Sequence, residues 1–171
     1  MTEAKSLPEL KRKENDGFIL EDSQRIISFR VETFQAFGDR LVSMVGAIVG
    51  RTLTYGIGTE IGQTALRYSR DEIRSEDDLG KVFDRVVTLR GWGRCLAMEK
   101  HDSDHKLVYV SRMKGTPTAH GRTATEPVCH LIRGIVAGWI EAYVGRTAKS
   151  SSEVACEATG KKFCVFETSF I

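Results

Sequence analysis

The stretch EPVCHLIRGIVAGWIEAYVG, residues 126–145, decides most of the architecture. Its apolar side chains recur at intervals of three and four residues, which is the period of an α-helix. Pro127 suits the start of such a helix, and Gly145 suits its end. The pattern predicts a long helix over 128–144 with apolar residues on two sides, at Val128, Leu131, Ile132, Ile135, Val136, Trp139, Ile140 and Tyr143.

The same helix carries a stripe of very small residues. Gly134 and Gly138 are four positions apart, and Ala142 follows after four more, so all three share one face. Another backbone can approach closely there. The stripe is explained either by packing inside one chain or by a helix–helix seam between the two chains of a homodimer.

The remaining periodicities predict an α+β fold. Helical spacing covers 33–49, a glycine-studded stretch covers 51–69, and a third helix covers 76–87. Alternating patterns predict a hairpin over 93–112 and a final hairpin over 153–168 that turns at residues 159–161. A short hairpin over 18–29 precedes them. We expect an antiparallel sheet of about four strands flanked by helices.

Length and charge limit the classes of protein that fit. The 171 residues predict one domain over 17–171, preceded by a charged, flexible leader at 1–16. Lys and Arg number 25 against 23 Asp and Glu, so charge indicates no nucleic-acid partner. The sequence contains neither an apolar run long enough for a transmembrane helix nor a secretory signal core. We therefore expect a cytoplasmic protein whose four cysteines stay reduced.

Three of those cysteines and one glutamate form a candidate metal site. Cys156 and Cys164 are symmetric about Gly160, so a regular hairpin places them opposite each other. With Cys129 and Glu153 they supply three sulfurs and one oxygen, a set that suits tetrahedral zinc. Glu153 and Cys156 are an odd number of residues apart, so the site requires a bulge or a strand start. The open alternatives are plain burial of the cysteines and a Cys156–Cys164 disulfide.

These stretches resemble a known family. EPVCHLIRGIVAGWIEAYVG and SEVACEATGKKFCVFE, residues 152–167, are similar to the C-terminal signature of the 4-vinyl reductase domain family. GWGR at 91–94 resembles the beginning of a strand in that family, and YGIGTEIGQTAL at 55–66 resembles its second helix. The resemblance covers residues 26–170. It implies a fold shared with TRAPP vesicle-tethering subunits and distantly with haem nitric-oxide-binding domains.

The resemblance also implies a ligand set for zinc. Phenol-sensing regulators of this family hold zinc on a cysteine at the start of the long helix, a glutamate, and two cysteines of the last hairpin. Those positions correspond to Cys129, Glu153, Cys156 and Cys164. The chain differs by one extra residue in the 146–152 loop, where an insertion costs little. The implied zinc is structural and closes the helix onto the hairpin.

The function expected from the resemblance is binding of an apolar or aromatic small molecule between the helices and the sheet, as a sensor that signals through a dimer or a protein partner. The sequence contains no nucleophile–base pair, nucleotide loop or paired-carboxylate motif, so we expect no enzyme. The alternatives are a TRAPP-like scaffold subunit and a reductase acting on a tetrapyrrole. Candidate ligand-lining residues, each of which also suits ordinary core, are Phe34, Phe37, Tyr55, Trp92, Trp139 and Tyr143.

Overall fold

The computed structural model describes residues 12–13, 18–21, 24–26, 29–103 and 106–171. Its main sheet has four antiparallel strands in the order β4-β5-β7-β6. The strands are β4 (Arg94–Ser103), β5 (Lys106–Lys114), β6 (Ser150–Ala155) and β7 (Cys164–Phe170). The predicted α+β class with a four-stranded antiparallel sheet is confirmed.

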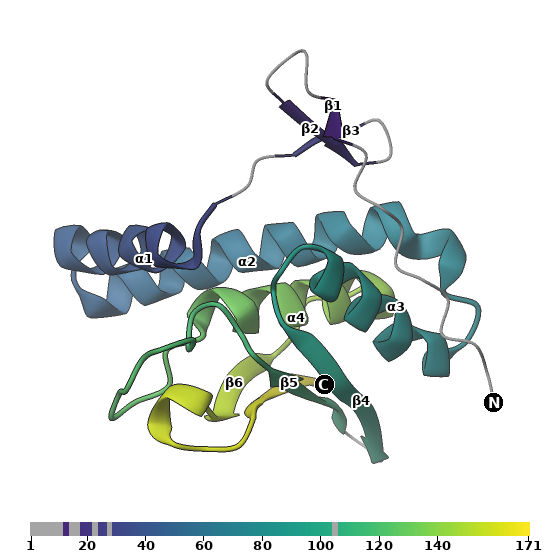
Figure 1. The fold of residues 1–171 in the computed structure, drawn as a ribbon. Helices are drawn as coiled ribbons and strands as arrows, with labels where there is room; N and C mark the ends of the chain where they lie inside the picture. Colours follow the sequence, from purple (N-terminus) through teal and green to yellow (C-terminus); the bar gives the residue numbers. More distant parts are fainter. Residues whose placement is uncertain (1–11, 14–17, 22–23, 27–28, 104–105) are drawn as a thin grey trace.

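The helices form layers over this sheet (Figure 1). α4 packs against strands β6 and β7, α2 packs on α4, and α1 packs on α2. α3 lies against β4. The helices are α1 (Val31–Val45), α2 (Ala47–Ser69), α3 (Glu76–Leu89) and α4 (His130–Val144), with short 3₁₀ turns at Arg70–Glu72 and Glu157–Thr159.

The first strands form a separate small sheet. β1 (Arg12–Lys13), β2 (Phe18–Glu21) and β3 (Gln24–Ile26) pair antiparallel in that order. The predicted hairpin over 18–29 corresponds to β2 and β3. The leader predicted over 1–16 lies outside the described residues, except for β1.

α4 is the central element of the fold. Every residue from 134 to 141 is buried, as the two-sided apolar pattern requires. On one side Trp139 meets Phe83 of α3, with ring centroids 5.2 Å apart. No helix among the described residues is long and apolar enough to cross a membrane.

The break between the first two helices differs from the sequence prediction. Helical spacing predicts it between residues 49 and 51, but the helices meet at Gly46, whose φ of 84° favours glycine. Gly50 lies inside α2, and a Cβ there would lie 2.7 Å from the Cα of Val42. The second glycine therefore lets α2 fold back closely on α1, whereas the first makes the turn.

The small-residue stripe of α4 packs against α2 of the same chain. A Cβ on Gly134 would lie 2.1 Å from the carbonyl oxygen of Tyr55, and one on Gly138 would lie 2.0 Å from that of Thr59. On the opposing helix, Gly58 and Gly62 are equally close to α4 backbone. Ala142 packs against the core. The two helices thus touch backbone to backbone, and this contact uses the glycine face within one chain.

We predict that Gly138→Ala lowers the free energy of unfolding by about 2 kcal/mol or more, because its methyl group has no room beside Thr59. Gly56→Ala is the matched control, since a Cβ there meets nothing within 4 Å and alanine favours the helix by about 1 kcal/mol. Urea denaturation of both variants measures the effect. Equal stability of the two would contradict the backbone contact.

Candidate metal site and ligand pocket

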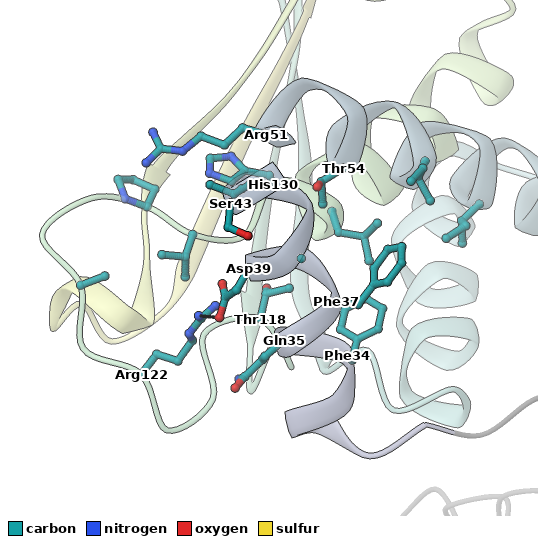
Figure 2. Close-up of a pocket in the computed structure, with 18 of the residues that line it drawn as sticks. Phe34, Gln35, Phe37, Asp39, Ser43, Arg51, Thr54, Thr118, Arg122 and His130 are labelled. Atoms are coloured by element: carbon teal, nitrogen blue, oxygen red, sulfur yellow. Dashed lines mark hydrogen bonds and ion pairs between the residues drawn. The ribbon is translucent and has the colours of Figure 1, made fainter. Parts of the chain in front are cut away.

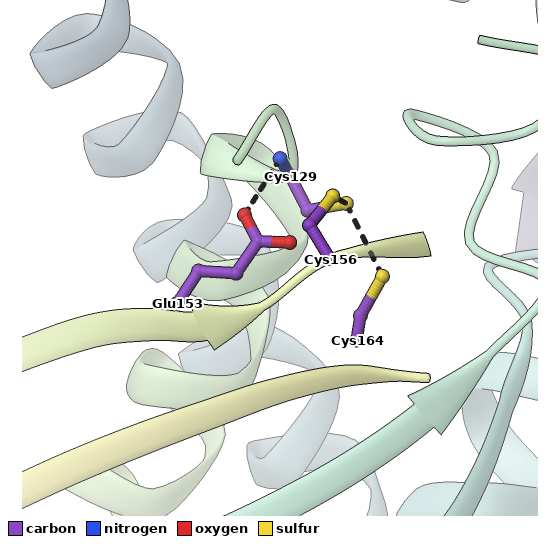
Figure 3. Close-up of side chains that lie close together, drawn as sticks. All are labelled: Cys129, Glu153, Cys156 and Cys164. Carbon is purple, nitrogen blue, oxygen red and sulfur yellow. Dashed lines mark hydrogen bonds between the residues drawn. The ribbon is translucent and has the colours of Figure 1, made fainter. Parts of the chain in front are cut away.

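Four side chains meet where the start of α4 reaches the last two strands. The thiols of Cys129, Cys156 and Cys164 and the carboxylate of Glu153 have ligand atoms within 4.8 Å of one another (Figure 3). The Sγ atom of Cys129 lies 3.8 Å from that of Cys156 and 3.7 Å from that of Cys164. These residues are positioned to hold a metal ion.

The backbone brings them together through a bulge and a helix cap. Cys129 is the N-cap residue of α4. The β6–β7 pairing shifts register between Glu153 and Ala155, which supplies the bulge that the odd spacing to Cys156 requires. Cys156 follows β6 directly, and Cys164 begins β7.

The geometry fits a tetrahedral ion. Sulfurs bound to zinc at about 2.3 Å lie about 3.8 Å apart along a tetrahedral edge, which matches the observed separations. The Glu153 Oε2 atom accepts a hydrogen bond from the Cys129 backbone N–H at 2.9 Å. Its Oε1 atom is buried and has no partner among the described residues. A cation would supply that missing partner.

The protonation of the cluster follows from its crowding. A hydrogen bond from Cys129 lowers the pKa of Cys156, so this thiol ionises first. Burial raises the pKa of the Glu153 carboxyl to about 8. Cys95 lies apart from the cluster, and burial raises the pKa of its thiol to about 12, which makes it inert.

The loop between β5 and α4 is tied to the cluster. The Thr116 Oγ1 atom, fully buried, lies 3.3 Å from the sulfur of Cys129 and 3.5 Å from that of Cys164. Glu157 accepts a hydrogen bond from the Gly115 N–H at 2.9 Å. The loop therefore starts and ends at the candidate metal site.

The outer side of this loop faces a pocket of about 440 Å³ (Figure 2). Helices α1 and α2 form its other walls. Its apolar lining residues are Phe34, Phe37, Val42, Ile57, Ile61, Ala124, Pro127, Val128 and Leu131.

The charged groups of this pocket are paired. Asp39 of α1 forms an ion pair with Arg122 of the loop, and Arg51 of α2 pairs with Glu126 at 2.9 Å. Burial lowers the pKa of His130, which also lines the pocket, to about 4. The pocket therefore has an apolar wall and no uncompensated charge at neutral pH.

The predicted ligand-lining residues lie in four places. Phe34 and Phe37 line this pocket, and Trp92 stacks edge-on against Phe34 with ring centroids 5.2 Å apart. Trp139 is fully buried in the core and Tyr143 lies under the guanidinium of Arg70 at 5.3 Å, so neither lines a described pocket.

Tyr55 lines a second, more polar groove of about 510 Å³ between α2, α4 and β6. The Arg133 guanidinium lies 4.7 Å from the centre of its ring.

Sequence reasoning missed the loop side of the first pocket. Thr118 and Arg122 lie in an irregular segment with no periodicity. Gln35 of α1 donates hydrogen bonds to the carbonyl oxygens of Pro117 and His120, across more than 80 residues of chain. No local pattern in the sequence signals such a contact.

Comparison with known proteins agrees with this geometry. Residues 109–170 match the model of the vinyl-4-reductase domain family. No curated protein matches the chain. The phenol-responsive sensory domain of the transcription activator PoxR, solved with phenol, is 19% identical and gives a TM-score of 0.77 over 94% of this chain and 84% of its own.

Two further solved structures share the fold. A vinyl-4-reductase family protein from Methanocaldococcus jannaschii is 22% identical, with a TM-score of 0.54 over 84% of this chain and 82% of its own. A trafficking protein particle complex subunit 3 from Naegleria fowleri, covalently bound to palmitic acid, is 14% identical, with a TM-score of 0.53 over 81% of this chain and 93% of its own. The chain therefore carries a vinyl-4-reductase domain match over residues 109–170, and the resemblance to the 4-vinyl reductase family is confirmed.

Proposed function

We propose that this protein is a small-molecule-binding domain of the sensory type, which takes an apolar or aromatic ligand in the pocket between α1, α2 and the 115–130 loop. The pocket carries the proposal, because its volume of about 440 Å³ lies in the range of small-molecule sites and its wall is mainly apolar. The structural neighbour from PoxR is a phenol-responsive sensory domain, which supports the same class of function.

The cluster of Cys129, Glu153, Cys156 and Cys164 holds a structural zinc ion in this proposal. All four protein ligands are supplied, which is typical of structural rather than catalytic zinc. Val128, His130 and Leu131 line the pocket on either side of Cys129. A metal bound there fixes the position of one pocket wall.

Two alternative functions from the sequence have less support. The likeness to the trafficking subunit is at the level of fold, so it gives a scaffold role no site of its own. A tetrapyrrole reductase needs a bound electron donor, and neither described groove carries a phosphate-binding glycine loop.

An uncovered apolar surface supports a homodimer. α1 has an apolar face but no buried residue, and seven large apolar side chains of the α1–α2 hairpin are 42 to 84% exposed. Monomers rarely expose apolar patches above a few hundred Å². A second copy would cover this face rather than the glycine stripe, which α2 already occupies. The seven residues are Phe37, Met44, Val45, Ile48, Val49, Leu53 and Ile57.

We predict one zinc ion per chain in protein purified without chelators, measured by mass spectrometric metal analysis. Cys156→Ser should lose the zinc and melt at a lower temperature, because structural zinc binding is linked to folding. Cys95→Ser is the control, since Cys95 lies outside the cluster and should leave the zinc in place. Metal-free protein whose melting is unchanged by EDTA, or a Cys156–Cys164 disulfide, would refute the zinc site.

We predict that a compound from a panel of phenols, fatty acids, isoprenoids and tetrapyrroles raises the melting temperature. At 100 times its dissociation constant a ligand stabilises the fold by about 2.7 kcal/mol. Gly38→Leu should abolish the shift, because Gly38 lines the pocket and a Cβ there meets open space. Gly56→Leu is the control, since its Cβ meets equally open space on the second groove.

A panel without any active compound would contradict the proposal. So would a shift that survives Gly38→Leu, which would place the ligand elsewhere. The helix–sheet interior is the site to examine then, because Ser111 Oγ and Trp139 Nε1 are buried there without a partner among the described residues.

We predict a dimer of twice 19.1 kDa by light scattering. The double variant Met44→Glu, Ile48→Glu should be monomeric and still folded, because both side chains are mostly exposed and their charges would lie in the interface. Tyr68→Glu, at the far end of α2 and 71% exposed, should remain dimeric. A wild-type monomer at micromolar concentration would rule out the dimer.

A further inference from the structure

One polar atom of the pocket between α1, α2 and the 115–130 loop lacks a partner. Thr118 is 8% exposed, and its Oγ1 atom is buried with no hydrogen bond to any described residue. A buried hydroxyl left without a partner costs about 1–3 kcal/mol. The side chain lines the pocket between Gln35 and the Asp39–Arg122 pair (Figure 2).

The neighbouring polar side chains already have partners. Gln35 donates to two loop carbonyls, and Thr54 donates to the Gly50 carbonyl oxygen at 2.7 Å. Ser43 donates to the Arg40 carbonyl oxygen at 2.9 Å. Thr118 therefore stands out as a deeply buried hydroxyl that is free to bind a molecule in the pocket.

The charges around the pocket argue against an ionic ligand. Arg122 and Arg51 are each paired with a carboxylate, so an anion would lose its hydration and gain no free cation in return. Asp39 and Glu126 are the same pairs seen from the acidic side, so a cation meets the same cost.

We propose that the pocket selects an uncharged, mainly apolar molecule that carries one hydroxyl group, whose oxygen exchanges a hydrogen bond with Thr118 Oγ1. The apolar body packs against the Phe34 and Phe37 side of the pocket. This proposal rests on the proposed function, because it assigns the chemistry that the same pocket recognises. It adds a polar contact that decides between ligands of equal size and shape.

Two probes of matched shape test it: 2-naphthol, which carries the hydroxyl, and 2-methylnaphthalene, which replaces it with a methyl group. Their dissociation constants are measured by titration with the wild-type protein, Thr118→Val and Thr118→Ser. We expect wild type to bind 2-naphthol about 5- to 10-fold more tightly, as one net hydrogen bond provides. Thr118→Val should lose this preference, and Thr118→Ser should keep it.

The charged analogue 2-naphthoate should bind more weakly than 2-naphthol to all three proteins. Thr118→Val should melt at the same or a higher temperature without ligand, because it removes an unsatisfied hydroxyl at nearly constant volume.

The outcomes separate this inference from the proposed function. Binding of both naphthalenes with equal affinity, or a preference that Thr118→Val retains, would overturn the role of Thr118 and leave the pocket in place. Failure of both probes to bind, or binding that Gly38→Leu does not affect, would overturn the pocket and this inference with it.

Discussion

The backbone contact between α2 and α4 is the constraint on which the rest of the structure depends. Glycines on both helices remove the side chains that would hold the axes apart, so carbonyl oxygens of one helix lie where a Cβ of the other would be. α4 is thereby enclosed between α2 and the sheet, which explains its unbroken buried stretch. The start of α4 is also fixed in space, and both candidate sites are built on it.

Those two sites share one short segment. Cys129 turns its sulfur toward Cys156 and Cys164, while its neighbours Val128 and His130 face the pocket. The 115–130 loop joins them a second time, since Thr116 touches the sulfurs and Thr118 lines the pocket. A bound metal would thus position a pocket wall without itself meeting the ligand. α1 closes the opposite side through the Gln35 hydrogen bonds and the Asp39–Arg122 pair.

Much of this arrangement can be predicted from local sequence patterns. The apolar period of α4 is strong enough to define the helix, and the odd spacing of Glu153 and Cys156 requires the bulge that the strands contain. The predicted break between α1 and α2 is misplaced because Gly46 and Gly50 look alike in sequence, although one makes a turn and the other a close contact.

The ligand site is harder to predict, because it depends on contacts between distant segments. The helical position of Trp139 gives only the face on which it lies, and that face packs against Phe83 rather than lining a pocket. The pocket itself depends on hydrogen bonds between Gln35 and the 117–120 segment, which no periodicity records.

The central claim is that a metal at the start of α4 holds one wall of a ligand pocket. Hydrogen exchange of the purified protein, measured with and without a chelator, tests it most directly. We predict faster exchange over 115–131 after metal removal, with the α3 and β4 amides unchanged. Equal exchange over 115–131 in both states would contradict it.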